Sequence, residues 1–319
     1  MTHAGYEALA EETALWMRTV ETDVWDEPSM RELAARRGWE WTDGAHGPVV
    51  RSGDPGGEPR LSPVTDHAKP YVNFDSYVAL SVPIADGGAD VFRRVADRLV
   101  AVLGPAPLMG SYGTLGPFFS STPAWGAPFL RWRGAPNSIE LRAGSTGPEL
   151  VLQPTAPIED WFWRQGHGEA RAIDGFFGHA KVGANSGLGL PGGWYAEDWE
   201  TFSPGLQRLL STLPAEAHAL AVEPSLRLYG RIPDRGAPTL YDITTEYVEL
   251  WADADFDAPG HGWPGPDWRL PIGEATAAHM IATARTLGIG SPRDLILASE
   301  ATSVGDYQVE FYGLGVAKG

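Results

Sequence analysis

The chain has 319 residues with a formal charge of −17, 43% hydrophobic residues, 13 Trp, 11 Phe, 10 Tyr and no cysteine. The length is typical of about two domains, and the apolar content excludes global disorder. The negative charge argues against nucleic acid as a partner, and the lack of cysteine excludes disulfides, thiol catalysis and cysteine-ligated metals.

The first half of the chain is predicted to alternate helices with short strands. Asp26 and Gly38 are the residue types that cap and end a helix, and the tryptophans after Gly38 alternate with polar residues as in a strand. Loops rich in glycine, proline and serine are expected over 53–70 and 110–128. The expected elements are helices over 6–20, 26–38 and 91–103, and strands over 39–42, 49–52, 71–82, 129–133, 138–142 and 149–153.

The second half opens with the clearest periodicity in the chain. Large apolar residues step by three and four over residues 197–213, which predicts an amphipathic helix whose stripe is core or, alternatively, a docking face. Pro204 is a candidate break in this helix, and Pro214 is expected to end it. The stripe consists of Trp199, Phe202, Leu206, Leu209 and Leu213. The later elements are expected to be a hairpin over 219–223 and 226–232, a strand over 239–252, a helix over 274–287, and strands over 295–298 and 307–312.

Both halves share the order helix, strands, helix, strands. The helices over 91–103 and 274–287 also end alike, with Leu-Gly followed by proline, although many helices end in this way. We therefore predict an α+β fold of two similar modules, each an antiparallel sheet packed against helices. The predicted modules span 1–155 and 196–319, with 156–195 as a linker or covering loop.

The N-terminal sequence indicates a protein of the cytoplasm. Its first residues, MTHAGYEALAEETALW, are acidic and lack the basic stretch and apolar run of a signal peptide. No stretch approaches the ~18 uninterrupted apolar residues of a membrane helix. Arginine far outnumbers lysine, and with the abundant alanine, glycine and proline this is typical of actinobacterial proteins. We expect a cytoplasmic location and no membrane partner.

Three enzyme motifs fail in their context. Residues 187–192 fit GxGxxG, but no strand precedes them and no helix begins within them, so a loop is favoured over a dinucleotide site. Ser111 lies in Met-Gly-Ser-Tyr-Gly, which is not the GxSxG of serine hydrolases. The eight histidines lack zinc-site spacing, although His167 and His179 flank one aromatic segment.

An acidic run offers a candidate metal site. Asp253, Asp255 and Asp257 alternate after the strand expected over 239–252, and alternating carboxylates can gather a hard cation. The glycine and glutamate that complete a calcium-binding loop are replaced by Ala258 and Pro264. A solvated acidic loop is therefore favoured, and a metal site is kept only for the alternative function.

Two groups of aromatic residues lie in or beside irregular sequence. Trp161 and Trp163 form one group, and Trp263 and Trp268 form the other. Aromatic residues in loops can anchor a partner chain, but they can also cap the core beneath a loop. These four tryptophans are the candidate partner-binding residues.

The second half resembles a known family. Its order of WETFSPGLQRLLSTLP, a hairpin, TLYDITTEYVELWA, GWPGPDWRLP, a helix and PRDLILASEA is similar to actinobacterial type III secretion chaperone-like, peptide-binding families. The resemblance covers about residues 199–301. It implies that the protein holds a client polypeptide, as such families do beside export systems and polymorphic toxins. It supplies no individual binding residues.

The leading hypothesis is a non-enzymatic binder of a protein or peptide, such as a secretion chaperone or the immunity partner of an exported toxin, with no cofactor. It rests on the resemblance, the acidic composition and the failed enzyme motifs. The alternative is a metal-assisted hydrolase that uses the loop from Asp253 to Asp257 together with a histidine.

Overall fold

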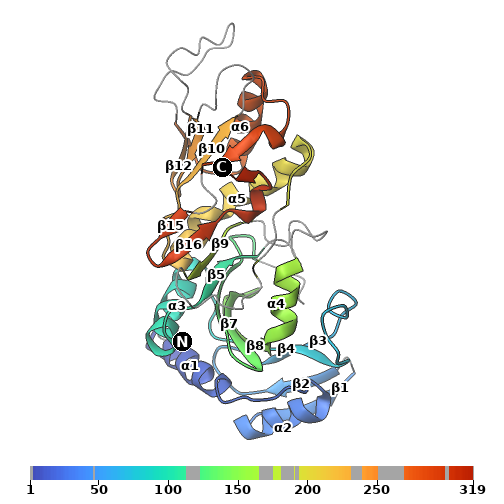
Figure 1. Ribbon diagram of the computed structural model, residues 1–319. Coiled ribbons are helices and arrows are strands. Elements are labelled where there is room, and N and C mark those ends of the chain that lie inside the picture. The colour runs from blue at the N-terminus through green and yellow to red at the C-terminus, as the bar shows by residue number, and fades with distance from the viewer. Residues whose placement is uncertain are drawn as a thin grey trace.

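The computed structural model describes residues 3–45, 47–112, 123–164, 175–180, 190, 194–230, 239–250, 269–298 and 302–318. Within these residues the chain forms an α+β fold, as predicted, with a nine-stranded sheet, a six-stranded sheet and a two-stranded hairpin (Figure 1). All strand pairs are antiparallel except one. No helix in these ranges is long and apolar enough to cross a membrane.

The N-terminal elements follow the sequence signals closely. Helix α1 (His3–Met17) is followed by α2 (Glu27–Arg37), which the Asp26 carboxylate caps by accepting a hydrogen bond from the Ser29 N–H at 2.9 Å. Gly38 ends α2 in the left-handed conformation, with φ of 79°. Strands β1 (Glu40–Gly44) and β2 (Gly47–Arg51) then pair as the two-stranded hairpin.

The nine-stranded sheet has the order β15-β16-β9-β5-β6-β7-β8-β4-β3. Most of it comes from the first half of the chain, but β15 and β16 arrive from the C-terminal segment and pair beside β9. Its strands and helices are β3 (Arg60–Pro63), β4 (Tyr77–Pro83), α3 (Ala89–Leu103), β5 (Leu108–Ser111), β6 (Pro128–Trp132), β7 (Asn137–Ala143), β8 (Pro148–Pro154), α4 (Thr155–Arg164), β9 (Phe177–Ala180), β15 (Thr302–Val304) and β16 (Tyr307–Glu310).

The six-stranded sheet has the order β13-β12-β11-β10-β14-β17 and lies at the other end of the molecule (Figure 1). Helix α5 contacts both α3 and α6, so it links the two sheets. The elements of this part are α5 (Trp199–Leu220), β10 (Leu226–Gly230), β11 (Thr239–Ile243), β12 (Tyr247–Leu250), β13 (Arg269–Pro271), α6 (Glu274–Thr286), β14 (Leu295–Leu297) and β17 (Ala317–Lys318), with short 3₁₀ turns at Pro292–Asp294 and Tyr312–Leu314.

The two sheets contain one repeated unit. In each, a helix leads into a four-stranded meander, a second helix follows, and a last strand pairs antiparallel with the first strand of the meander. The first copy is α3-β5-β6-β7-β8-α4-β9 and the second is α5-β10-β11-β12-β13-α6-β14. This order matches α3 with α5, and not with α6 as the similar helix ends suggested. It also places α4 and β9, which lie in the expected linker over 156–195, inside the first copy.

Several element boundaries differ from the sequence predictions. Helix α5 runs through Pro204 and Pro214 to Leu220, because Leu213, Ala217 and Leu220 on both sides of Pro214 are buried and their packing holds the helix together. The hairpin expected from residue 219 is therefore wrong.

Several strands also differ from the sequence predictions. The single strand expected over 239–252 is two strands, β11 and β12, joined by a turn that the Thr244 hydroxyl stabilises through hydrogen bonds with the backbone of Glu246 and Tyr247. The predicted loop over 53–70 contains β3, and β5 extends into the predicted loop over 110–128. Both strands are short and rich in polar or small residues.

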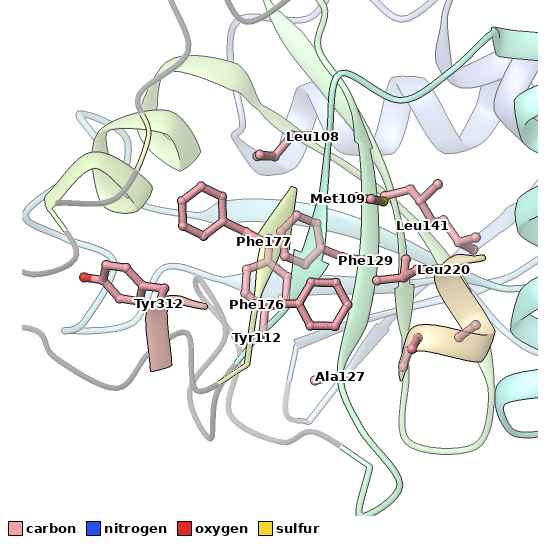
Figure 2. Close-up of a cluster of buried hydrophobic side chains, with 14 of the residues drawn as sticks. Leu108, Met109, Tyr112, Ala127, Phe129, Leu141, Phe176, Phe177, Leu220 and Tyr312 are labelled. Atoms are coloured by element: carbon pink, nitrogen blue, oxygen red, sulfur yellow. The ribbon is translucent and has the colours of Figure 1, made fainter. Parts of the chain in front are cut away.

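The core lies on both faces of the nine-stranded sheet. Leu130 and Trp132 of β6 face α1, α3 and α5, and the Trp132 indole donates to the Gly104 carbonyl at the end of α3 at 2.8 Å. Phe129 and Arg131 point to the opposite face, towards α4. Figure 2 shows the aromatic residues of this region, where Phe129 stacks on Tyr112 with ring centroids 4.2 Å apart. Phe176, Phe177 and Tyr312 continue the cluster, and Leu220 contributes from α5 (Figure 2).

Candidate functional site

The predicted partner-binding tryptophans have different environments. Trp161 is fully buried on α4 with its ring edge against Tyr112, so it packs in the core. Trp163, two residues further along the same helix, is 54% exposed. Residues two apart on a helix face in different directions, so Trp161 and Trp163 lie on different faces of α4 and do not form one surface. Trp263 and Trp268 lie outside the described residues.

The candidate metal and nucleotide motifs also lie outside the described residues. This holds for Asp253, Asp255 and Asp257, and for the GxGxxG motif except Leu190. Among the residues that the structure describes, no group of three or more His, Asp or Glu could hold a metal ion. The metal-assisted hydrolase therefore stays a hypothesis. A rise in melting temperature with calcium, magnesium, manganese or zinc would support it, because an ion that binds only the folded chain must stabilise it.

Two histidines on described elements, His179 and His218, have different surroundings. His179 on β9 is buried and stacks on Phe177. His218 on α5 is exposed, and its Nε2 lies 2.8 Å from the Asp90 carboxylate at the start of α3. His167, the other member of the candidate pair, lies outside the described residues.

A charged network is buried between the sheet and α4. The Arg131 Nε donates to Glu140 Oε2 at 2.9 Å, and the Tyr112 hydroxyl donates to the same oxygen at 2.8 Å. Gln153 adds a third hydrogen bond to this oxygen, at 3.2 Å. Burial lowers the pKa of Arg131, but the neighbouring Tyr112 and Glu140 raise it more, so Arg131 keeps its charge. Burial raises the pKa of Tyr112 well above its usual value, which keeps the phenol neutral.

A second ion-pair network lies on the same sheet face, across β7, β8 and the strands beside them. Arg142 Nε donates to Glu149 Oε1 at 2.6 Å, and Arg60 donates to Glu149 Oε2 at 2.5 Å. Arg142 also donates to the Ser81 hydroxyl at 3.1 Å. Burial raises the pKa of Glu149, but Arg142 and Arg60 lower it by more. The net shift is downward, so the carboxylate stays ionised. These pairs connect four adjacent strands and support their register.

Ser111 is buried beside an acidic side chain. Its hydroxyl donates to Glu216 Oε1, which also accepts the Ala127 N–H at 3.0 Å. Gly126 must be glycine here, because a Cβ on it would lie 2.5 Å from the Glu216 Cγ and its φ is 145°. The serine thus has a carboxyl neighbour in place of the histidine of a serine hydrolase. The contact joins α5 to β5 and to the residue before β6.

Glu216 should make stability depend on pH. Burial raises the pKa of its carboxyl, and the hydrogen bonds from Ser111 and Ala127 only partly oppose this. The folded chain therefore holds this proton more tightly than the unfolded chain. This contribution to stability is complete below the unfolded pKa and is lost as the pH rises through the folded pKa.

Urea unfolding of the wild-type chain and of Glu216→Gln tests the effect, measured from a pH below the unfolded pKa of Glu216 to a pH above its folded pKa. Glutamine keeps an acceptor oxygen but cannot ionise, so the variant should become more stable relative to wild type as the pH rises. Parallel profiles would show that the carboxyl does not titrate differently in the two states.

Two pockets open where α1, α2, α3 and the β6–β7 hairpin meet. The larger, of about 420 Å³, lies in the ~300–1,000 Å³ range of ligand sites, and the smaller has about 300 Å³. Val20 and Glu21 line both, so the chain after α1 forms a ridge between them. The larger pocket is lined by Met17, Arg18, Val20, Glu21, Leu103, Pro105, Pro107, Trp132, Arg133, Gly134, Ala135, Asn137 and Ile139. The smaller is lined by Trp16, Thr19, Val20, Glu21, Thr22, Ser29, Glu32, Leu33 and Arg36.

Hydrogen bonds from the sheet hold the ridge in place. The Asn137 side-chain N–H group on β7 donates to the Thr22 carbonyl at 2.7 Å and to the Val20 carbonyl at 3.3 Å. The Trp132 indole fixes the end of α3 on the opposite wall. Arg133 at the rim pairs with Glu159 at 2.5 Å. These contacts fix the walls of both pockets.

Exposed apolar side chains flank the pockets. Leu15 is 44% exposed and directly precedes Trp16, which lines the smaller pocket. Val24, at 47%, follows the ridge. The residues lining both pockets, with Leu15 and Val24, are called the α1–α2 corner below.

Comparison of the chain with family models, with characterised proteins and with solved structures finds no significant match. The resemblance to secretion chaperone-like families stays a hypothesis, and no site can be carried over from a relative. The assignment of the α1–α2 corner as the candidate site therefore rests on its structure alone.

Proposed function

We propose that the protein binds a polypeptide client in the cytoplasm, as a secretion chaperone or as the immunity partner of an exported toxin. The α1–α2 corner is the observation that supports this. The larger pocket combines apolar residues such as Met17, Leu103 and Trp132 with polar and charged ones, and the smaller is lined mostly by polar and charged residues. The exposed apolar residues Leu15 and Val24 lie near them in the chain. Neighbouring exposed apolar residues and pockets of this volume are typical of interaction sites.

Copurification from the source cells tests this function. The tagged wild-type chain should recover one polypeptide in near-equal amount, identified by mass spectrometry. The double variant Leu15→Asp, Val24→Asp should recover at least about tenfold less, because a charge at each position opposes burial of the contact. The matched control is Tyr195→Asp, since Tyr195 is also exposed, at 60%, but lies outside the corner.

The outcome of this experiment separates two questions. Recovery of no polypeptide by the wild-type chain would contradict client binding altogether. Equal recovery by wild type and by the double variant would place the client elsewhere, and Trp163 of α4 would then be the next surface to vary.

A further inference from the structure

We infer that the larger pocket of the α1–α2 corner binds a small zwitterion of the free α-amino acid class. The inference goes beyond client binding, because the ligand is a small molecule whose binding can be measured without a client. Three groups in the lining of the pocket support it: the Arg18 guanidinium, the Glu21 carboxylate and the amide oxygen of Asn137.

The pocket offers one positive and one negative side chain. The charged residues of its lining are Arg18, Glu21 and Arg133, and the other lining residues are uncharged. Arg133 is already held by Glu159 through two hydrogen bonds. Arg18 and Glu21 are exposed, and neither forms an ion pair with any residue that the structure describes. A ligand that carries both charges therefore complements this pocket better than a simple cation or anion does.

Asn137 adds a buried acceptor to the same wall. Asn137 is 8% exposed, and its Nδ2 donates to the carbonyls of Val20 and Thr22, on either side of Glu21 in the chain. Its Oδ1 has no hydrogen-bond donor among the described residues. A buried acceptor without a donor costs free energy, and an N–H group of a ligand removes this cost. The amide oxygen thus lies beside the segment that carries Glu21, where an ammonium group can reach both.

The ends of two helices also favour an ammonium group here. Met17 ends α1 and Leu103 ends α3, and both residues line the pocket. A helix carries a partial negative charge at its C-terminus, which attracts a nearby cation. The ammonium group of the ligand is therefore assigned to Asn137 Oδ1 and Glu21. Its carboxylate is assigned to Arg18, because a guanidinium binds a carboxylate through paired hydrogen bonds. The volume of about 420 Å³ leaves room for the ligand's side chain.

Binding of free amino acids to the purified full chain tests the inference. The standard L-amino acids are screened one by one for a rise in melting temperature, and the affinity of each that raises it is measured by calorimetry. At least one should bind. Its N-acetyl derivative lacks the ammonium charge and its primary amide lacks the carboxylate, so each should bind at least about tenfold more weakly. If no amino acid raises the melting temperature, or if both derivatives bind as tightly as the parent, the inference is wrong.

Single variants assign each charge of the ligand to its partner. Arg18→Met should weaken the amino acid at least about tenfold and bind it no better than its amide, because the carboxylate has lost its partner. Glu21→Gln should weaken it and reduce the difference between the amino acid and its N-acetyl derivative. Arg94→Met and Glu246→Gln, at exposed positions outside the pocket, are the matched controls and should bind as wild type. Melting temperatures without ligand show that each variant is folded.

The variants also give the result that would overturn the location. If Arg18→Met and Glu21→Gln bind the amino acid as tightly as the two controls do, the ligand lies elsewhere and the assignment to this pocket is wrong. The inference and the proposed function fail separately. A chain that recovers a client but binds no amino acid contradicts the inference alone. A chain that binds an amino acid through Arg18 and Glu21 but recovers no polypeptide contradicts client binding alone.

Discussion

Glu140→Ala should lower the free energy of unfolding by about 3–5 kcal/mol, because it leaves the Arg131 charge buried without its partner. Both side chains are almost completely inaccessible, at 1% and 0% exposure, and they lie opposite each other on β6 and β7. The Tyr112 hydroxyl would also lose its acceptor. Urea unfolding at neutral pH measures the change.

Removing both charges should cost much less than removing one. Replacing Arg131 by Met and Glu140 by Leu leaves no buried charge, and such apolar replacements of a buried ion pair are often neutral or stabilising. Glu223→Ala, at an exposed position just after α5, is the control for loss of an acidic residue, with little expected change. If the double variant is less stable than Glu140→Ala, the loss of the attraction between Arg131 and Glu140 lowers the free energy of unfolding more than an unpaired buried charge does.

Leu206→Ala should lower the free energy of unfolding by about 2–5 kcal/mol, as large-to-small changes in a packed core do. Leu206 lies on α5 with no exposed surface, and the other four residues of its apolar stripe are also buried. The burial predicted from the periodicity is therefore confirmed. Ser211→Ala, at an exposed position of the same helix, is the matched control and should change stability little.

Leu206→Asp distinguishes core from interface. A buried aspartate should unfold the chain or lower its melting temperature strongly. An unchanged melting temperature with loss of client binding would instead make the stripe a docking face, and the core assignment would be wrong.

Local signals in the sequence predicted local structure well. The cap at Asp26, the stop at Gly38 and the stripe from Trp199 to Leu213 each depend on residues within a few positions of one another. The hairpin of β6 and β7 and its extension by β8 also followed from adjacent patterns. The α+β class could therefore be predicted from the sequence alone.

Long-range pairing could not be predicted in this way. β5 contains Gly110 and Ser111, whose strand propensity is low, and it is stabilised by β6 and β9 on either side. α5 continues past Pro214 because buried residues beyond the proline hold it, which no local rule anticipates. The pairing of β16 with β9 connects segments that are distant in the sequence.

The candidate site was missed for a related reason. Its pockets combine the end of α1, the end of α3, α2 and the β6–β7 hairpin, which are separate in the sequence. The tryptophans in irregular sequence were the more obvious candidates for a binding site, but Trp161 is buried and packs in the core.

The position of β16 has a consequence for synthesis of the protein on the ribosome. During translation β5, the other neighbour of β9, emerges long before residues 307–310, so the outer edge of β9 remains unpaired until β16 has been made. An open edge in a nascent chain can pair with another chain and start aggregation. Stop codons placed before residue 307 should therefore yield insoluble fragments, although all strands from β3 to β9 have been made.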